Sequence, residues 1–333
     1  GPGGDGAAGG GRKGMFGAVS DLLNDMFSEE SKHKNIEKWQ QQQRQMSSMW
    51  INSILPEWDR KKAPPRQARE LWRMGLPTMV RGEVWARSIG NKLSITPQLF
   101  DIMKQKARST ADTMAMKSAM EMIEADMPDI FPYLALFVPG NPFRDVLCDI
   151  LEAYTAYRPD VGYRKGIGEL AAMLMLHMNV HGAFVSLCNL LNSKFFLGLY
   201  KTELGKLTGY FEVYKKLFAS NLPYIHKHFE KLKIKEEHYL LDWFRTIFTC
   251  AMPLHIATRI WDTFLIEKET FLFRVSLGLL QTLRKSLLKT TYEQCVVMLR
   301  KLPHDLDEVT LFLNIYQIQI PKAAIEKIAL AST

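Results

Sequence analysis

Histidine spacing gives the first place where this sequence could hold a metal. His177 and His181 are four residues apart, so a helix would place both imidazoles on one face. A zinc protease also needs a glutamate directly after the first histidine, where this chain has Met178. His226 and His228 have no obvious third ligand. We therefore predict no metal site.

A second chemical candidate is the stretch RPDVGYRKGIGELA, which runs from residue 158 to 171. Gly166 and Gly168, with Ala171 three residues on, outline the fingerprint of a dinucleotide-binding loop. Such a loop must follow a β-strand, but residues 157–162 have the composition of a loop. The glycines are better explained as a tight turn into a helix that begins near Gly168.

The elements that would position these residues are helices. Apolar residues recur at helical spacing over residues 147–156, 168–177, 183–191, 239–248 and 271–288. Alternating strand patterns are scarce, and no Asn-Gly or Asp-Gly turn joins two of them. The sequence therefore predicts an all-α fold without a significant sheet.

The composition is typical of a globular protein with a mildly basic surface. The 333 residues are 47% hydrophobic, which is enough for one large domain or two coupled lobes. The net charge is +8, and its densest patches are short, such as residues 60–62 and 231–235. We expect no nucleic-acid partner, although the basic excess could favour anionic membranes or phosphate ligands.

The cysteines and the hydropathy pattern predict a cytoplasmic protein. Cys148, Cys188, Cys250 and Cys295 form no C-x-x-C pair, so we expect reduced, buried thiols. No apolar run approaches the roughly 18 residues of a membrane span. The amino terminus shows no apolar core of a signal peptide.

Composition and breaks divide the chain into five predicted segments. These are a disordered Gly-rich tail at 1–14, a helical extension at 15–63, an N-terminal lobe at 64–205, a C-terminal lobe at 206–322 and a tail at 323–333. Gly1-Pro2 is consistent with a scar from tag cleavage. The extension is predicted to pack on the main body, with binding to a membrane or partner as the alternative.

Short motifs follow one another in a specific order between residues 66 and 320. They are RELWRMGLP from Arg69, RGEVW from Arg81, IEAD from Ile123, FP from Phe131, YRPDVGY from Tyr157, LDW from Leu241, RIWD from Arg259 and FLFR from Phe271. This ordered set resembles the TBC domain, the module of Rab GTPase-activating proteins. The resemblance implies a two-lobed, V-shaped helical fold whose N-terminal lobe carries the catalytic loops.

The resemblance also implies which residues build the frame or the Rab interface. They are Arg69, Trp72, Gly75, Arg81, Trp85, Asp126, Tyr157, Arg158, Asp160, Gly162, Tyr163, Gly166, Asp242, Trp243, Trp261 and Asp262.

Family members insert two side chains into the nucleotide site of a GTP-bound Rab. An arginine in I-x-x-D-x-x-R stabilises charge on the γ-phosphoryl group and is worth about 10³ to 10⁵ in rate. A glutamine in Y-x-Q orients the attacking water. The matching positions here are Asp129, which follows Ile123 and Asp126, and Lys165, which follows Tyr163.

These two substitutions predict a domain that binds a Rab but lacks two-finger activation, a pseudo-GAP. Asp129 would repel a triphosphate if it pointed inward, and beside it Pro128 alters the backbone. Lys165 has donors but no acceptor, so it cannot orient water as glutamine does.

Two alternatives stay open. The chain could be an active Rab GTPase activator that uses Lys165, Arg164 or Arg144 as its cation, although Arg144 is most simply a surface residue. It could also be a helical scaffold without a GTPase partner. In either case it is a regulatory protein rather than an enzyme in itself.

The resemblance has consequences for cofactors, partners and location. The chain would hold no cofactor, because GTP and Mg²⁺ would be carried by the Rab. We expect a monomer in the cytoplasm that takes part in membrane trafficking. Its membrane contact would be indirect, through the lipid anchor of the Rab.

Overall fold

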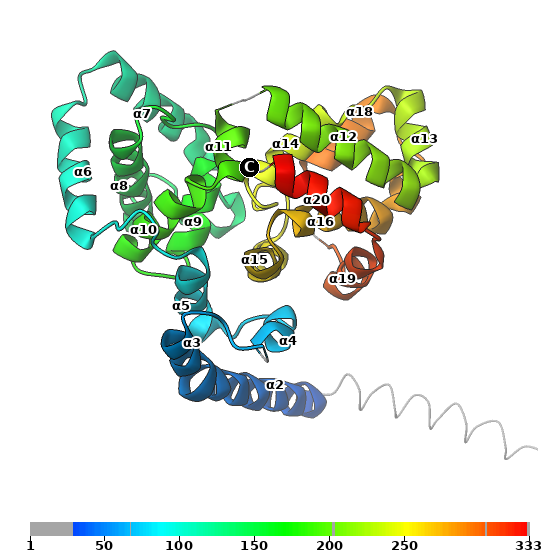
Figure 1. Ribbon diagram of the computed structural model, residues 1–333, viewed down its shortest axis with the longest axis horizontal. Helices are drawn as coiled ribbons and strands as arrows, with labels where there is room; N and C mark the ends of the chain where they lie inside the picture. Colours follow the sequence, from blue (N-terminus) through cyan, green and yellow to red (C-terminus); the bar gives the residue numbers. More distant parts are fainter. Residues whose placement is uncertain (1–28, 67, 202–203, 304, 332–333) are drawn as a thin grey trace, which may run out of the picture. The chain divides into compact units, whose positions relative to one another are not determined.

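The computed structural model describes residues 29–66, 68–201, 204–303 and 305–331 (Figure 1). All regular secondary structure in these ranges is helical, and they contain no strand, which confirms the all-α prediction. The predicted tail at 1–14 and the first part of the predicted extension lie outside the described residues. No single helix within these ranges is long and apolar enough to cross a membrane. Only α10 (Val180–Leu191) and α11 (Lys194–Tyr200) pass that test as a pair, with an 81° bend between them.

The chain divides into two compact units, Gly1–Arg66 and Gln67–Thr333. The first contains α2 (Glu29–Met49), the π-helix η1 (Trp50–Ile54) and α3 (Leu55–Lys61) as one continuous helical run. Lys62 ends this run with a φ of 55° in the left-handed region. The predicted division of the second unit into lobes at 205, and its V shape, stay predictions.

The second unit contains the other helices of the described residues. They are α4 (Ala68–Arg73), α5 (Thr78–Ile89), α6 (Pro97–Ser109), α7 (Met114–Asp126), η2 (Met127–Asp129), η3 (Pro132–Leu134), α8 (Pro142–Tyr157), α9 (Ile167–Met175), α10 (Val180–Leu191), α11 (Lys194–Tyr200), α12 (Leu204–Asn221), α13 (Pro223–Leu232), η4 (Glu236–His238), α14 (Leu240–Arg245), α15 (Leu254–Glu267), α16 (Glu269–Thr282), α17 (Arg284–Leu287), α18 (Tyr292–Arg300), α19 (Glu308–Gln317) and α20 (Lys322–Ala331).

Side-chain caps and prolines fix where several of these helices begin. Thr96 Oγ1 accepts a hydrogen bond from the Leu99 amide (3.3 Å), and Asn179 Oδ1 accepts one from the Gly182 amide (2.8 Å). Each bond satisfies an amide that has no partner inside its helix. Proline, whose missing N–H costs nothing at this position, begins α6, α8 and α13.

The helices that hold the candidate site pack around α8 and α9. α8 packs against α6, α7, α9 and α10, and α9 is buried along its whole length. Elements that are distant in sequence are also in contact. α15 contacts α4 and α5, and α16 contacts α19. η2 and the turn between α8 and α9 are therefore held by rigid helices on both sides.

Two predicted helices are shorter than their apolar patterns. The pattern over 239–248 yields only α14, because Ile247 and Phe248 adopt left-handed φ values of 50° and 62°. The pattern over 271–288 is divided into α16 and α17 near Thr282. The Thr282 hydroxyl donates a hydrogen bond to the Gly278 carbonyl (2.8 Å). Such a side-chain bond competes with the backbone hydrogen bonds of a regular helix.

All four cysteines are free, as predicted. Cys188 and Cys295 are buried, but Cys148 is half-buried and Cys250 is exposed. The prediction of buried thiols was therefore wrong for these two. Cys250 lies in the turn that follows α14, whose irregular backbone brings it to the surface.

Candidate functional site

The predicted catalytic loop is a compact turn between α8 and α9. Gly162 and Gly166 have φ values of 64° and 100°, in the region that favours glycine. A Cβ on Gly166 would also lie 3.1 Å from the Tyr200 hydroxyl. α9 begins at Ile167 directly after this turn, as the glycine spacing predicted, and no strand precedes it.

Arg158 and Asp160 give this turn its shape. Arg158 donates from Nε and Nη2 to the two oxygens of Asp160 (2.8 and 2.9 Å) and from Nη1 to Asn192 Oδ1 (3.0 Å). Lys201 Nζ lies 2.8 Å from Asp160 Oδ2. Hydrogen bonds from Arg158 and then Lys201 hold the pKa of Asp160 well below its usual range. Arg158 therefore ties the turn to the end of α10.

The two predicted finger positions face each other. Lys165 Nζ lies 3.7 Å from Asp129 Oδ2 and 3.9 Å from Asp126 Oδ1. Tyr163 donates its hydroxyl to Asp126 Oδ2 at 3.0 Å. The Tyr163 ring is buried, whereas the Lys165 and Asp129 side chains are 68% and 70% exposed. We call Asp126, Asp129, Tyr163 and Lys165 the finger cluster.

A buried acid that the sequence analysis missed lies near the finger cluster. Glu169 stands in the first turn of α9, is only 5% exposed, and its Oε2 atom has no hydrogen-bond partner within the described part of the chain. Burial raises its pKa to about 7, and the negative charge of Asp126 adds to this effect. Its position inside the apolar run GELAAMLM was the signal available in the sequence.

The finger cluster carries a net negative charge. Lys165 supplies one positive charge, while Asp126 and Asp129 supply two negative charges, before any ionisation of Glu169. The arrangement can hold the Lys165 ammonium in place. It presents neither a free cation nor an amide to an incoming phosphate.

The other two candidate cations differ in their surroundings. Arg144 forms an ion pair with Glu124 and donates to the Phe137 carbonyl (3.1 Å), and its side chain is only 14% exposed. The interpretation of Arg144 as a simple surface residue was therefore wrong, because these bonds hold it against the chain. The exposed Arg164 side chain has no hydrogen-bond or ion-pair partner among the described residues.

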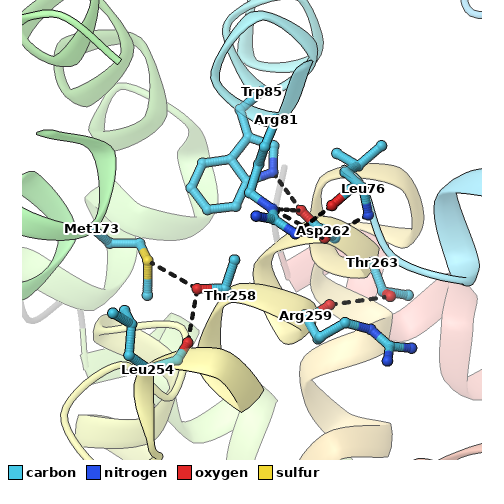
Figure 2. Close-up of polar contacts among 9 residues, drawn as sticks. All are labelled: Leu76, Arg81, Trp85, Met173, Leu254, Thr258, Arg259, Asp262 and Thr263. Atoms are coloured by element: carbon cyan, nitrogen blue, oxygen red, sulfur yellow. Dashed lines mark hydrogen bonds and ion pairs between the residues drawn. The ribbon is translucent and has the colours of Figure 1, made fainter. Parts of the chain in front are cut away.

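A buried polar hub around Asp262 joins α5 to α15 (Figure 2). Asp262 accepts hydrogen bonds from the Leu76 amide (3.0 Å), Trp85 Nε1 (2.7 Å) and Arg81 Nε (3.2 Å). Its exposure is 0%, and burial raises its pKa despite the nearby Arg81. The Trp85 ring stacks on Trp261 at 5.2 Å. These motif residues form part of the frame.

Gly75 and Arg259 extend this frame. Gly75 has a φ of 101°, and a Cβ there would lie 3.0 Å from Arg259 Cδ. The Arg259 guanidinium pairs with Glu308 and lies 4.6 Å from the centre of the Phe312 ring. Thr258, one turn after Leu254 on the same helix, donates to the Leu254 carbonyl at 2.7 Å (Figure 2).

The remaining motif residues have their contacts with residues outside the finger cluster. Trp72 and Trp243 are buried, and Trp243 Nε1 donates to the Leu299 carbonyl at 3.0 Å. Tyr157 is half-buried with its ring edge on Phe184, whereas Arg69 and Asp242 are exposed. A contact between any of these residues and a partner stays a prediction.

The histidines pack against aromatic rings. The His177 ring meets Trp85 edge-on at 4.7 Å, and His181 meets Phe100 at 5.4 Å. Burial, and then the charge of Arg81, lowers the pKa of His177 to about 4. In the ranges that the structure describes, no group of three or more His, Cys, Asp or Glu could hold a metal ion.

Comparison with known proteins gives consistent matches. Residues 78–288 match the Rab-GTPase-TBC domain family. The mouse (Mus musculus) TBC1 domain family member 12 is 37% identical over 321 residues, which cover 91% of this chain and 46% of that protein. Human (Homo sapiens) TBC1 domain family member 14 is 38% identical over 291 residues, 81% and 41% of the two chains. Drainin of Dictyostelium discoideum is 31% identical over 331 residues, which cover 84% of this chain and 76% of that protein.

The chain spans less than half the length of the first two relatives. Two solved structures share its fold. The Chlamydomonas flagellar RabGAP TBC domain has a TM-score of 0.66 at 20% identity and covers 84% of this chain and 95% of that one. The Ypt/Rab-GAP domain of Gyp1p has a TM-score of 0.62 at 16% identity, covering 80% and 92%.

Proposed function

The chain belongs to the Rab-GTPase-TBC family, and from this premise we propose that it binds a GTP-loaded Rab-type GTPase without supplying two-finger activation. The observation that carries the proposal is the ion pairing of Lys165 with Asp129 and Asp126. The motif resemblance assigns Asp129 to the arginine position and Lys165 to the glutamine position. In this proposal neither finger is available to the Rab.

Electrostatics supports the loss of activation. The transition state of GTP hydrolysis carries negative charge on the γ-phosphoryl group, and an arginine finger is worth about 10³ to 10⁵ in rate. A carboxylate about 4 Å from that charge would instead cost about 1 to 4 kcal/mol, depending on exposure to water. Asp129 is exposed, so the lower end of this range applies.

The buried frame supports retained binding. Asp262 keeps its bonds to Leu76, Arg81 and Trp85, and Arg158 keeps its fork on Asp160. The fork shapes the turn that carries Tyr163 and Lys165, and the bonds of Asp262 join α5 to α15. In the proposal, the family surface is intact and only its chemistry is lost.

One observation favours a second candidate, an active GTPase activator with an unusual finger. Arg164 is exposed, without a side-chain partner within the described ranges, and directly precedes Lys165. Arg144 and Lys165 are weaker choices, because each is paired with a carboxylate. In this case the Rab's own glutamine would position the water.

The biological setting follows from the Rab in this proposal. The GTPase brings GTP, Mg²⁺ and a lipid anchor, so the chain acts in membrane trafficking as a cytoplasmic, monomeric effector, scaffold or competitor of active activators. Segments that the longer relatives have outside the matched region could add to this role.

Two assays on the same panel of Rabs test the proposal. The chain is immobilised and offered each Rab loaded with GDP or with a non-hydrolysable GTP analogue, and the captured Rabs then enter a single-turnover hydrolysis assay. We expect preferential capture of the GTP form and no acceleration. Capture that ignores the nucleotide would favour a scaffold without a GTPase partner, and acceleration of about 10³ or more would overturn the proposal.

Arg164→Ala separates the two candidate functions. If the first is correct, this variant captures the Rab as the unmodified chain does, and the Rab hydrolyses GTP at the same rate with either protein. If Arg164 is the finger, an activity present in the unmodified chain disappears. Arg108→Ala is the matched control, because Arg108 is also exposed and lies on α6, where it pairs with Asp149.

A further inference from the structure

A basic hollow lies between α13 and α17, outside the elements of the finger cluster. Its volume is about 460 Å³, and it is lined by Tyr224, Lys227, His228, Lys231, Arg284 and Leu288. The first four lie at positions i, i+3, i+4 and i+7 of α13, so they share one helix face. Arg284 begins α17 and its guanidinium lies 5.4 Å from the centre of the Tyr224 ring.

The positive charges of the hollow are not neutralised. No carboxylate in the described residues lies within ion-pair distance of Lys227, Lys231 or Arg284. The acid on α13, Glu230, instead approaches His226 at 3.6 Å. Residues 284–289 add two more lysines and no acid. Three unpaired cations around one hollow attract a ligand with several negative charges.

The walls of the hollow are apolar between these charges. Tyr224 is 71% exposed and Leu288 is 38% exposed, so both leave hydrophobic surface in water beside the cations. Lysine stems and a tyrosine ring suit the boundary between lipid headgroups and acyl chains. A small soluble anion would leave this apolar surface uncovered.

His228 adds a polar atom to the same wall. Its Nε2 atom is buried and has no hydrogen-bond partner in the part of the chain that the structure describes. An imidazole nitrogen that carries a proton donates to an oxygen. The same side chain lines the hollow, so a polar group without a protein partner lies beside the three cations.

We propose that this hollow binds the multiply phosphorylated headgroup of a membrane lipid. Lys227, Lys231 and Arg284 pair with the phosphates, while Tyr224 and Leu288 meet the lipid below them. The chain then contacts an anionic membrane directly, in addition to any contact through the anchor of a Rab. This inference stands independently of GTPase binding.

Vesicle flotation without any GTPase tests the site. Phosphatidylcholine vesicles that contain a phosphatidylinositol bisphosphate should bind the chain more tightly than vesicles in which phosphatidylserine supplies the same total charge. The variant Lys227→Gln/Lys231→Gln/Arg284→Gln should weaken binding about 100-fold, from about 1 kcal/mol for each cation near the surface. Thermal melting of both proteins shows that the variant is folded.

A matched variant separates the hollow from general charge. Lys117→Gln/Lys194→Gln/Lys322→Gln removes the same number of exposed cations from α7, α11 and α20 and should bind vesicles like the unmodified chain. Equal losses in the two triple variants would overturn the proposal. The proposal is also overturned if the unmodified chain binds neither kind of vesicle.

Tyr224→Ser distinguishes a lipid from a free headgroup. It should weaken vesicle binding severalfold while leaving binding of soluble inositol trisphosphate unchanged, because only the lipid covers the ring. If Tyr224→Ser binds vesicles normally and the soluble headgroup binds as tightly as vesicles do, the lipid assignment is wrong.

Discussion

At the residue scale, Asp262 and Asp129 show how surroundings decide what a carboxylate does. Asp262 is fully buried, and its oxygens accept bonds from three donors in α5 and the segment before it. Asp129 is 70% exposed, and within the described ranges its one charged partner is the ammonium of Lys165. The first is fixed as a structural link, whereas the second is free to turn away.

Asp262→Ala should lower the free energy of unfolding by about 3 to 5 kcal/mol, because it leaves the buried Arg81 without its counter-charge. Urea unfolding measures the change. Asp112→Ala breaks the exposed pair with Lys117 and should cost less than about 1 kcal/mol. Similar losses in the two variants would contradict the structural role of Asp262.

Glu169→Gln should stabilise the protein at about pH 8 and change little at about pH 5. Burial raises the pKa of Glu169 from 4.5 to about 7, so the folded state keeps a proton that the unfolded state releases. Stability therefore falls as the pH rises through this window, and glutamine, which cannot ionise, removes that loss. The gain at high pH should be on the order of 2 to 3 kcal/mol.

Unfolding curves at both pH values measure this gain. The exposed Glu121→Gln makes the same chemical change at the surface and provides the control. A gain from Glu169→Gln that is equal at both pH values would mean that its ionisation does not limit stability.

At the element scale, the finger cluster depends on how closely α9 approaches η2. Gly168 makes this approach possible, because a Cβ there would lie 2.6 Å from Ile130 Cδ1 and 3.0 Å from the Tyr163 hydroxyl. Ile130 follows Asp129 directly at the end of η2. The contact of two short elements therefore sets where Asp129 stands relative to Lys165.

Gly168→Ala should destabilise the domain by about 1 to 3 kcal/mol through overpacking, although alanine favours a helix. Ile130→Val removes the methyl group that the new Cβ would meet. The double variant should therefore lose less stability than the sum of the two single changes, a coupling that a double-mutant cycle measures. Additive losses would show that Ile130 is not the obstacle.

Periodicity predicted α8, α9 and α10 but not the end of α14. Ile247 has a β-branched side chain and nevertheless adopts a left-handed φ of 50°, against its local preference, because tertiary packing overrides it. Glu169 was missed for a related reason. Its position in an apolar run indicated a buried acid, but the sequence does not show that this acid lacks a hydrogen-bond partner among the described residues.

At the scale of the whole molecule, the charge is distributed unevenly. The chain carries a net charge of +8, yet the finger cluster is negative and the hollow beside α13 is positive. An acidic cluster suits a polar protein surface better than a bare triphosphate, and a basic hollow suits an anionic membrane. The two sites are built from different helices and can be tested separately.

The helical class of the described residues was predictable, whereas their long-range contacts were not. Helical spacing and the absence of strand patterns indicated the all-α fold, and the ordered motifs indicated the family. The contacts of α15 with α4 and α5, and of α16 with α19, join segments far apart in sequence. The distance between Lys165 and Asp129 likewise required coordinates, because 35 residues separate them in the chain.

The most direct test of the central claim is single-turnover GTP hydrolysis by a captured Rab, with the unmodified chain and with Asp129→Arg/Lys165→Gln. The account predicts the intrinsic rate with the unmodified chain and an increase of about 10³-fold or more with the double variant. Asp112→Arg/Lys117→Gln makes the same changes in an exposed ion pair on another part of the chain and should leave the rate of GTP hydrolysis at its intrinsic value. Acceleration by the unmodified chain, or a double variant that captures the Rab and remains silent, would contradict the account.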